Sequence, residues 1–501
     1  MERITPGHAW SLFDTAATRR LEHAAQAGLP AHTLMQRAGA AVARLAGALA
    51  PHARLVWIAC GPGNNGGDGL EAAALLRQTG RPVAATLYGD AGRLPADAAA
   101  SLARARAAGV DFVPGPPAGL GPQDLCVDAL LGLGLRAADA RPPAGLLARA
   151  LADLRASRAT VLAVDLPSGL DADTGGWPAA WAMAGQERHT LSLLTLKPGL
   201  FTADGRDAAG NIWLDTLGVD PATTAGGIPP TAWLAGLPAQ AGRRHASHKG
   251  SYGDVAVVGG EGLGLRGMGM TGAAVLAATA ALHGGAGRVL LALLDGNAGV
   301  AIDPAQPELM LRSLAALDLR HGAVVCGCGG GEAVRAALPR VLGEAGHLVL
   351  DADALNAIAA DAGLQRLLEH RAGRGAPTVL TPHPLEAGRL LGRSAAGVQA
   401  DRLGAARALA SRYGCVAVVK GSGTVVAAPD GRVHLNPTGN GRLATAGTGD
   451  VLAGMAGARL AAGLEAFDAA TAAVYEHGAL ADAWPADRPL TAGLLAQRFA
   501  G

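Results

Sequence analysis

The stretch LATAGTGDVLAGMAGARLAAG, residues 443–463, places small and hydroxylated residues and one aspartate directly before a helix rich in alanine and glycine. Gly447 and Gly449 let backbone N–H groups turn toward a ligand, and a helix start adds partial positive charge. We interpret residues 446–449 as an anion cradle for a transferring phosphoryl group. Asp450 would accept the proton of a substrate hydroxyl as that oxygen attacks phosphorus. A capped helix start is the alternative explanation of the tetrapeptide alone.

Around this stretch, short apolar runs alternate with Ala-rich helices along both halves of the chain. Apolar runs of this length between helices predict parallel sheets covered on both faces. We therefore expect an α/β protein with two doubly wound domains, whose ligands bind at the carboxyl ends of the strands. The expected strands lie in segments 54–60, 82–89, 124–132, 159–169, 189–200 and 210–218, and then in 253–260, 287–294, 322–330, 347–355, 377–384 and 415–428.

Residues 220–250 are rich in Pro, Gly and Ala and have no periodicity, which is typical of a boundary. We expect a first domain at 1–225, a linker at 226–244 and a second domain at 245–501. A length of 501 residues is ample for two domains with their own cores.

Composition excludes several classes of protein. The formal net charge is +1 and no long basic run occurs, which argues against a nucleic-acid partner. No apolar run predicts a membrane span, and the first residues have no apolar signal core. The five cysteines lie mostly in apolar runs without zinc spacing, so we expect reduced core residues in a cytoplasmic protein.

The segment CGPGNNGGDGLEAA, residues 60–73, follows an expected strand and opens a helix. Its glycines match the dinucleotide fingerprint, although a plain structural turn is the alternative. Asp68 would repel a pyrophosphate at the helix start. Asn64, Asn65 and Asp68 therefore suit a neutral or cationic part of a ligand, or a metal.

Oxygen-bearing residues also follow two other expected strands, at Asp128 and at Asp165 with Ser168. Parallel strands bring such ends to one edge, where Asn65, Asp128 and Ser168 would offer oxygen ligands with one negative charge. A single carboxylate suits a monovalent cation. Helix capping by the aspartates is the alternative.

Five segments in this half together resemble the NAD(P)H-hydrate epimerase domain, a Rossmann-like three-layer sandwich. They are TLMQRAG (33–39), NNGGDG (64–69), VDALLGLGL (127–135), DLPSGLD (165–171) and TLKPGL (195–200). The resemblance implies interconversion of the R and S hydrates, with K⁺ held by Asn65, Asp128 and Ser168. It implies that Asp165 contributes acid–base chemistry or stabilises an iminium ion. The implied contacts to the hydrated nucleotide are Asn64, Asn65, Gly66, Gly67, Asp68, Gly132, Leu133, Gly134, Leu135, Arg136, Ala137, Ala138 and Asp165.

The second half has no Walker A motif. It resembles the ribokinase-like superfamily, with an α/β/α domain, and within it the ADP/ATP-dependent NAD(P)H-hydrate dehydratases. The matching segments are KGSYGDVAVVGG (249–260), MTGAAVLAATAALHGGAGRV (270–289), PELM (307–310), DADALN (351–356), LTPHPLEAGRLL (380–391), VVKGSGTVV (418–426) and GNGRLATAGTGDVLAG (439–454).

This second resemblance implies that Ala273, Gly329, His383 and Asp450 contact the hydrated nucleotide. It implies ADP as the phosphoryl donor, and we expect Mg²⁺ because phosphoryl transfer needs charge neutralisation. The implied nucleotide contacts are Lys420, Gly421, Ser422, Gly423, Thr424 and Gly449. A packing role is the alternative for His383, and helix capping or metal association is open for Asp351 and Asp353.

Two segments depart from the family pattern: Gly441 and Arg442 follow GN where Pro-Gly is common, and GCGGG (327–331) replaces Gly-Pro-Gly-Leu-Gly. The resulting expectation is a homo-oligomeric repair enzyme that epimerises NADHX and NADPHX and dehydrates the S-epimer with ADP. A ribokinase-like kinase for a vitamin-like alcohol and a nucleotide-binding scaffold without activity are the alternatives.

Overall fold

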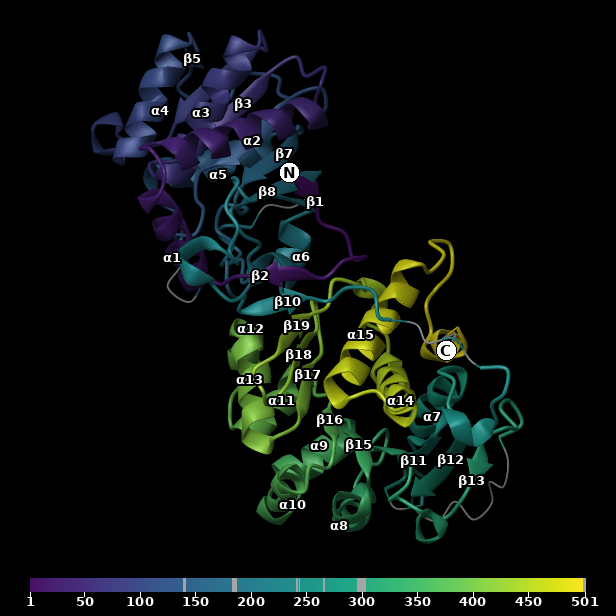
Figure 1. Ribbon diagram of the computed structural model, residues 1–501. Coiled ribbons are helices and arrows are strands. Elements are labelled where there is room, and N and C mark those ends of the chain that lie inside the picture. The colour runs from purple at the N-terminus through teal and green to yellow at the C-terminus, as the bar shows by residue number, and fades with distance from the viewer. Residues whose placement is uncertain are drawn as a thin grey trace. The chain divides into compact units, whose positions relative to one another are not determined.

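The computed structural model (Figure 1) describes residues 1–137, 141–182, 187–239, 242, 244–264, 266–294 and 303–498. The chain divides into two compact units. The first comprises Met1–Thr5 and Trp10–Trp233, and the second comprises Pro6–Ala9 and Leu234–Gly501. The division lies inside the expected linker 226–244, and this range contains a short strand, β10 (Ala232–Leu234).

The first unit is built on an eight-stranded sheet with the order β1-β9-β8-β7-β6-β3-β4-β5. Strands β3 to β9 run parallel, and β1 pairs with β9 in the antiparallel sense. The strands are β1 (Glu2–Arg3), β3 (Val56–Cys60), β4 (Val83–Leu87), β5 (Asp111–Phe112), β6 (Leu125–Ala129), β7 (Thr160–Val164), β8 (Arg188–Leu193) and β9 (Asn211–Asp215); β2 (Trp10–Leu12) precedes the first helix.

The direction of winding reverses between β3 and β6, which places a crevice at the carboxyl ends of these strands. The helices of this unit are α1 (Thr15–Ala27), α2 (Thr33–Leu49), α3 (Asn64–Gln78), α4 (Ala96–Ala107), α5 (Gly145–Ala156) and α6 (Gly205–Ala208). The helix that segment 60–73 was expected to open begins at Asn64. This start depends on Gly66, because a Cβ atom there would overlap the carbonyl of Gly61.

The sheet of the second unit contains the strands β13-β12-β11-β14-β15-β16-β17-β18-β19 in that order. Pairing is parallel from β13 to β17 and antiparallel among β17, β18 and β19. The strands are β11 (Asp254–Glu261), β12 (Arg288–Leu294), β13 (Met310–Leu311), β14 (Ala323–Cys326), β15 (His347–Leu350), β16 (Thr378–Leu380), β17 (Val416–Val419), β18 (Val425–Ala427) and β19 (Val433–Leu435).

The expected strand segment 415–428 is thus a hairpin, in which residues 420–424 turn the chain between β17 and β18. Gly421 and Gly423 supply the positive φ values of this turn, +142° and +61°. The main helices are α7 (Thr271–His283), α8 (Val334–Glu344), α9 (Ala352–Ala359), α10 (Ala362–Gly373), α11 (Pro384–Leu391), α12 (Ala395–Ala400), α13 (Arg402–Tyr413), α14 (Thr448–Ala461), α15 (Ala466–Asp482) and α16 (Ala492–Gln497).

Small residues explain how α14 fits into the core of the second unit. Ten of its residues are buried, and a Cβ atom at Gly454 would overlap the backbone of Ala277 in α7. The Ala- and Gly-rich sequence therefore lets two helices approach closely, as dense packing requires. This packing fixes the start of α14, where Asp450 lies.

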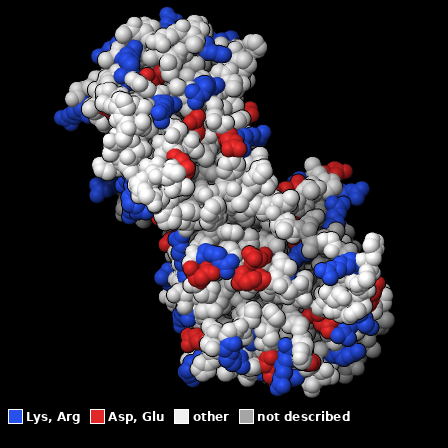
Figure 2. Space-filling model, viewed as in Figure 1, with Lys and Arg blue, Asp and Glu red and all other residues white. Residues whose placement is uncertain are grey.

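All five cysteines are buried and free, which confirms their expected place in the core. No helix in the described part of the chain combines the length and apolarity needed to cross a membrane. On the face drawn in Figure 2, basic and acidic side chains are interspersed.

Candidate active sites

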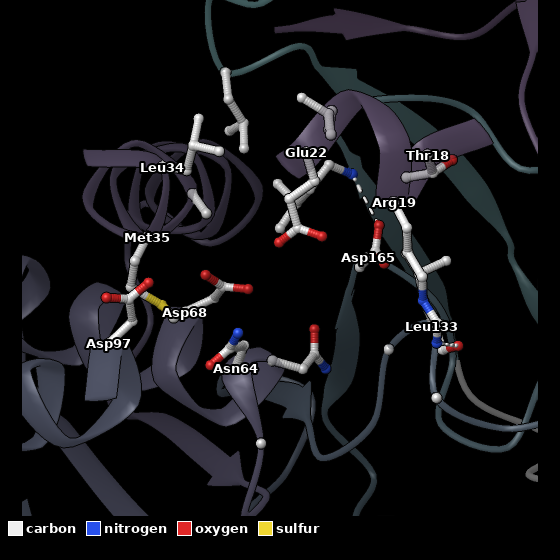
Figure 3. Close-up of a pocket in the computed structure, with 18 of the residues that line it drawn as sticks. Thr18, Arg19, Glu22, Leu34, Met35, Asn64, Asp68, Asp97, Leu133 and Asp165 are labelled. Carbon is white, nitrogen blue, oxygen red and sulfur yellow. Dashed lines mark hydrogen bonds between the residues drawn. The ribbon is translucent and has the colours of Figure 1, made fainter. Parts of the chain in front are cut away.

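A cavity of about 440 Å³ lies at the reversal point of the first sheet. Helices α1, α2 and α3 and the segments after β6, β7 and β8 supply its lining residues. Figure 3 shows carboxyl groups of Glu22, Asp68 and Asp165 directed into this space. Of the residues predicted from sequence, Asn64, Asn65, Asp68, Gly132, Leu133, Gly134 and Asp165 line it.

Asp165 is bonded to Lys197, a pair that the sequence did not predict (Figure 3). The Lys197 side chain is fully buried and also donates to the carbonyl of Leu193 at 2.7 Å. Asp165 follows β7 with φ of +67° and accepts a hydrogen bond from the Leu193 amide at 3.1 Å. These contacts fix the carboxylate at the cavity wall, where it lines the cavity rather than capping a helix. A single lysine within the apolar run HTLSLLTLKPGL was the available signal.

Acidic side chains surround this pair. Burial and then the charge of Asp165 raise the pKa of Glu22. The pKa of Asp68 is raised well above its usual range by burial, and next by Asp165 and Glu22. Asp97 also lines the cavity and lies 2.5 Å from Nδ1 of His32. The cavity is therefore suited to a ligand portion that carries or develops positive charge.

The three predicted potassium ligands lie on segments that meet beside this cavity. Asp128 is fully buried and accepts hydrogen bonds from the Ser168 hydroxyl at 2.6 Å and the Ser168 amide at 3.0 Å. Burial raises the pKa of Asp128. A Cβ atom at Gly132 would lie 3.4 Å from both Asn65 Oδ1 and Asp165 Oδ2. The Asn65 amide nitrogen is buried without a partner among the described residues.

The 132–138 loop reaches beyond the first cavity. Gly134, Leu135 and Arg136 line an adjacent cavity of about 500 Å³, and the Ala137 amide donates to Asp171 at 2.8 Å. Ala138 lies outside the described residues.

Gly66 and Gly67 are buried and do not appear among the lining residues of the described cavities. A Cβ atom at Gly67 would lie 2.8 Å from the Met35 side chain and 2.9 Å from the Ala98 backbone. Their observed contacts are therefore with neighbouring protein segments.

The second site is centred on Asp450, in the first turn of α14. Ligand atoms of Cys328, Asp351 and Asp450 all lie within 4.8 Å of one another. Burial, and next the charge of Asp351, raise the pKa of Asp450 to about 7. An aspartate with this pKa can both take up and release a proton near neutral pH, which suits a catalytic base.

Lys420 connects this cluster to the hairpin turn. Its ammonium group lies 2.6 Å from Asp351 Oδ1, and a Cβ atom at Gly449 would lie 3.3 Å from the same nitrogen. The structure therefore brings together Lys420, Gly449 and Asp450. In the turn itself, Ser422 is exposed and Thr424 donates to the carbonyl of Gly421 at 3.1 Å.

The structure gives the contacts of Asp351, Asp353 and His383, for which the sequence left alternatives open. Asp351 stands at the start of α9 but its side chain makes no capping bond, because it binds Lys420 instead. Asp353 accepts from the Gly331 amide at 2.8 Å. His383 caps α11 by accepting from the Leu385 amide at 3.1 Å, and its side chain is 46% exposed. A capping role is thus observed for His383, and its other ring nitrogen, Nε2, lies 3.2 Å from Glu386 Oε1.

Ala273 and Gly329 are neighbours, since a Cβ atom at Gly329 would lie 2.8 Å from that of Ala273. Of the departures from the family pattern, Arg442 is exposed and Cys328 is buried beside Asp450. Sequence reasoning did not predict the contact of Cys328 with the Asp450 cluster.

Comparisons with known proteins cover both units. Residues 257–500 match the family described as NAD(P)H-hydrate dehydratase, and residues 31–199 match the family described as YjeF-related protein N-terminus. The bifunctional NAD(P)H-hydrate repair enzyme Nnr of Escherichia coli is 36% identical over 98% of this chain and 92% of its own. The ADP-dependent (S)-NAD(P)H-hydrate dehydratase of Neisseria meningitidis is 43% identical over 52% of this chain and 86% of its own.

A solved ADP/ATP-dependent NAD(P)H-hydrate dehydratase of Bacillus subtilis is 32% identical, covers 52% of this chain and 91% of its own, and has a TM-score of 0.42. With a 36% identical relative matched over almost its full length and a domain match in each half, the chain belongs to the family of bifunctional NAD(P)H-hydrate repair enzymes.

Proposed function

We infer that this chain repairs hydrated NADH and NADPH. The first unit interconverts the R and S hydrates, and the second unit dehydrates the S-epimer with ADP as phosphoryl donor, releasing AMP and phosphate. The observation that carries this inference is the match of both halves to bifunctional repair enzymes over 98% of the chain. Separate carboxylate clusters around Asp165 and Asp450 support a separate reaction in each unit.

For the first unit, we propose that Asp165 transfers a proton at the hydroxyl on C6 of the hydrated ring. The C6–O bond breaks, water leaves, and the lone pair of the neighbouring ring nitrogen forms an iminium ion. Glu22, Asp68 and Asp165 would stabilise this cation because they make the cavity acidic. Water then adds to the other face and returns a proton. Lys197 keeps Asp165 in place and balances its charge.

Potassium is proposed for the buried oxygen cluster beside this cavity. Asp128, Ser168 and the side-chain oxygen of Asn65 fit a hard monovalent cation, because the cluster has one carboxylate and Asp128 forms no ion pair with the described residues. A bound K⁺ would supply positive charge that orders the loops after β6 and β7.

For the second unit, we propose that Asp450 accepts the proton of the substrate hydroxyl as that oxygen attacks the terminal phosphorus of ADP. The bond to the AMP leaving group breaks, and the hydroxyl becomes a phosphate ester. Amides at the start of α14 and the Lys420 ammonium would stabilise the charge on the transferred group. Phosphate, a better leaving group than hydroxide, departs from C6, and loss of a proton from C5 restores the dihydronicotinamide.

Magnesium is proposed to be held mainly by the nucleotide phosphates. Asp351 and Asp450 offer oxygen ligands, but the third member of their cluster is the buried Cys328 thiol. The Lys420 ammonium group is also already bonded to Asp351. Mg²⁺ prefers oxygen and retains ligands from phosphate and water. It would neutralise charge during phosphoryl transfer.

The test is incubation of purified chain with NADHX and either ADP or ATP. Recovery of absorbance at 340 nm with free phosphate and AMP supports repair with ADP. A lasting phosphoester with no recovery would instead support the small-molecule kinase.

We also propose that the chain is a cytoplasmic homo-oligomer. Its five free cysteines support a reducing compartment, and light scattering measures its assembly.

A further inference from the structure

Helix α1 contributes a wall of the first cavity through Thr18, Arg19, Glu22 and Gln26. Thr18, Glu22 and Gln26 are spaced by four residues and Arg19 lies three before Glu22, which places them on one face of the helix. The family match of this unit begins at residue 31, so this helix lies outside it. This helix nevertheless supplies lining residues of the cavity.

Glu22 carries the one acidic group on that face. Among the residues that the structure describes, its carboxyl forms no hydrogen bond or ion pair that would give it a structural role. Two buried acids of this unit are paired, by contrast: Glu71 binds Ser101 and Arg104, and Asp124 binds Arg54. Figure 3 shows the Glu22 carboxyl in the open space that Asp68 and Asp165 also face. Its polar group is thus directed toward whatever fills the cavity.

Epimerisation needs proton transfer on two faces of the ring. Water leaves from one face and another water adds to the opposite face, so a group on each side must donate or accept a proton. Asp165 follows β7 and is held by Lys197 and the Leu193 amide, whereas Glu22 belongs to α1, so the two carboxyl groups enter the cavity from different elements.

We propose that Glu22 is a second catalytic residue of the epimerase site, serving the ring face that Asp165 does not reach. Protonated Glu22 donates to the C6 hydroxyl, the C–O bond breaks, and water leaves with the bonding pair. Water that adds from the other face gives its proton to Asp165. In the reverse direction the two residues exchange roles. This proposal rests on the proposed epimerase function.

The charges around Glu22 distinguish it from Asp68. Glu22 faces the acids Asp68, Asp97 and Asp165 but also the cations Arg19 and Lys197. Asp68 is influenced by Glu22, Glu71, Asp97 and Asp165, and its pKa lies well above its usual range. Glu22 therefore has both cations and acids beside it, whereas the charges named beside Asp68 are all acidic.

The experiment follows exchange of purified (R)-NADHX by chromatography without ADP, after subtraction of the spontaneous rate. Glu22→Gln keeps the size and removes the titrating group, Glu22→Asp keeps the acid, and His23→Gln is the control because His23 is exposed on the same helix. We expect Glu22→Gln to lower kcat by at least about 100-fold with little change in KM. Glu22→Asp should recover part of the rate, and His23→Gln should match the wild type. Glu22→Gln should also lose one limb of the pH profile.

The proposal would be overturned if Glu22→Gln exchanged the epimers at the wild-type rate. It would also be overturned if only Asp68→Asn, and not Glu22→Gln, lost epimer exchange. If Glu22→Gln lost both activity and thermal stability, the exchange rate of Glu22→Asp would separate the two roles. Partial recovery of the rate by the shorter acid would support proton transfer by residue 22, and no recovery would overturn the proposal. Absence of exchange by the wild type would instead contradict the proposed epimerase function.

Discussion

The ammonium group of Lys420 lies 2.6 Å from a carboxylate oxygen of Asp351, whose other neighbours include the proposed base Asp450. Asp351 therefore acts on two groups at once. It stabilises the positive charge of Lys420, and its own charge raises the pKa of Asp450.

Replacing the proposed base tests the chemistry of the second unit. Asp450→Asn should lower the dehydration rate at 340 nm by at least about 100-fold, because no carboxylate remains to accept the hydroxyl proton. ADP affinity measured by calorimetry should change little. The exposed Asp487 provides the control substitution Asp487→Asn. Retained turnover in Asp450→Asn would exclude this residue as the base.

The pH dependence of dehydration should report Asp450. Its pKa is raised to about 7, by burial first and then by Asp351. The base form exists above this pKa, so kcat/KM should rise as the pH increases through about 7 and then level off. Asp351→Asn removes a negative neighbour and should move the rise to lower pH. An unchanged midpoint in Asp351→Asn would argue that another group controls the profile.

Breaking the buried ion pair of the first unit should cost stability. Lys197→Met leaves Asp165 without its cation and should lower the free energy of unfolding of this unit by about 3 kcal/mol. In the double variant with Asp165→Asn the loss should be smaller than the sum of the single losses, because no carboxylate is left unpaired. Urea titration of the three variants measures this coupling, and additive losses would contradict it.

Potassium should accelerate epimer exchange. At constant ionic strength, replacement of KCl by choline chloride should slow exchange, because Asp128 and Ser168 then lack the cation proposed to order their loops. Asp128→Asn should be slow in both salts. Equal wild-type rates in KCl and choline chloride would remove potassium from the proposal.

The turn before α8 should tolerate only glycine at position 329. Its φ is +58°, and a Cβ atom would overlap the carbonyl of Met270, so Gly329→Ala should destabilise the second unit by about 2 kcal/mol. Gly343 provides the control, since it lies exposed in α8 with no atom near an added Cβ. Gly343→Ala should stabilise by about 0.5–1 kcal/mol. Chemical denaturation compares the two.

The sequence predicted the parallel sheets because buried strands appear as short apolar runs between helices, as at β3 and β15. The turn within 415–428 was not recognised, although Gly421 and Gly423 provided the signal, because apolar residues continue on both sides. Hairpin pairing depends on which strands meet, and local composition does not contain that information.

The site was predictable where polar residues follow a strand directly, as Asp165 and Asp128 do. Lys197, Glu22 and Cys328 were missed because their proximity to the other site residues arises from tertiary contacts between distant segments. No pattern in the helix sequence of α1 shows which of its faces lies against a cavity.

Because all five cysteines are buried, their reaction with a thiol reagent can report the unfolding of each unit. Cys60 and Cys126 belong to one unit, and Cys326, Cys328 and Cys415 belong to the other. Burial raises the pKa of these thiols, so an alkylating reagent should ignore them while their unit is closed. During denaturation, chains would be pulsed with such a reagent and analysed by mass spectrometry. Two adducts would mark unfolding of the first unit and three would mark unfolding of the second, so the adduct count would show which unit unfolds first.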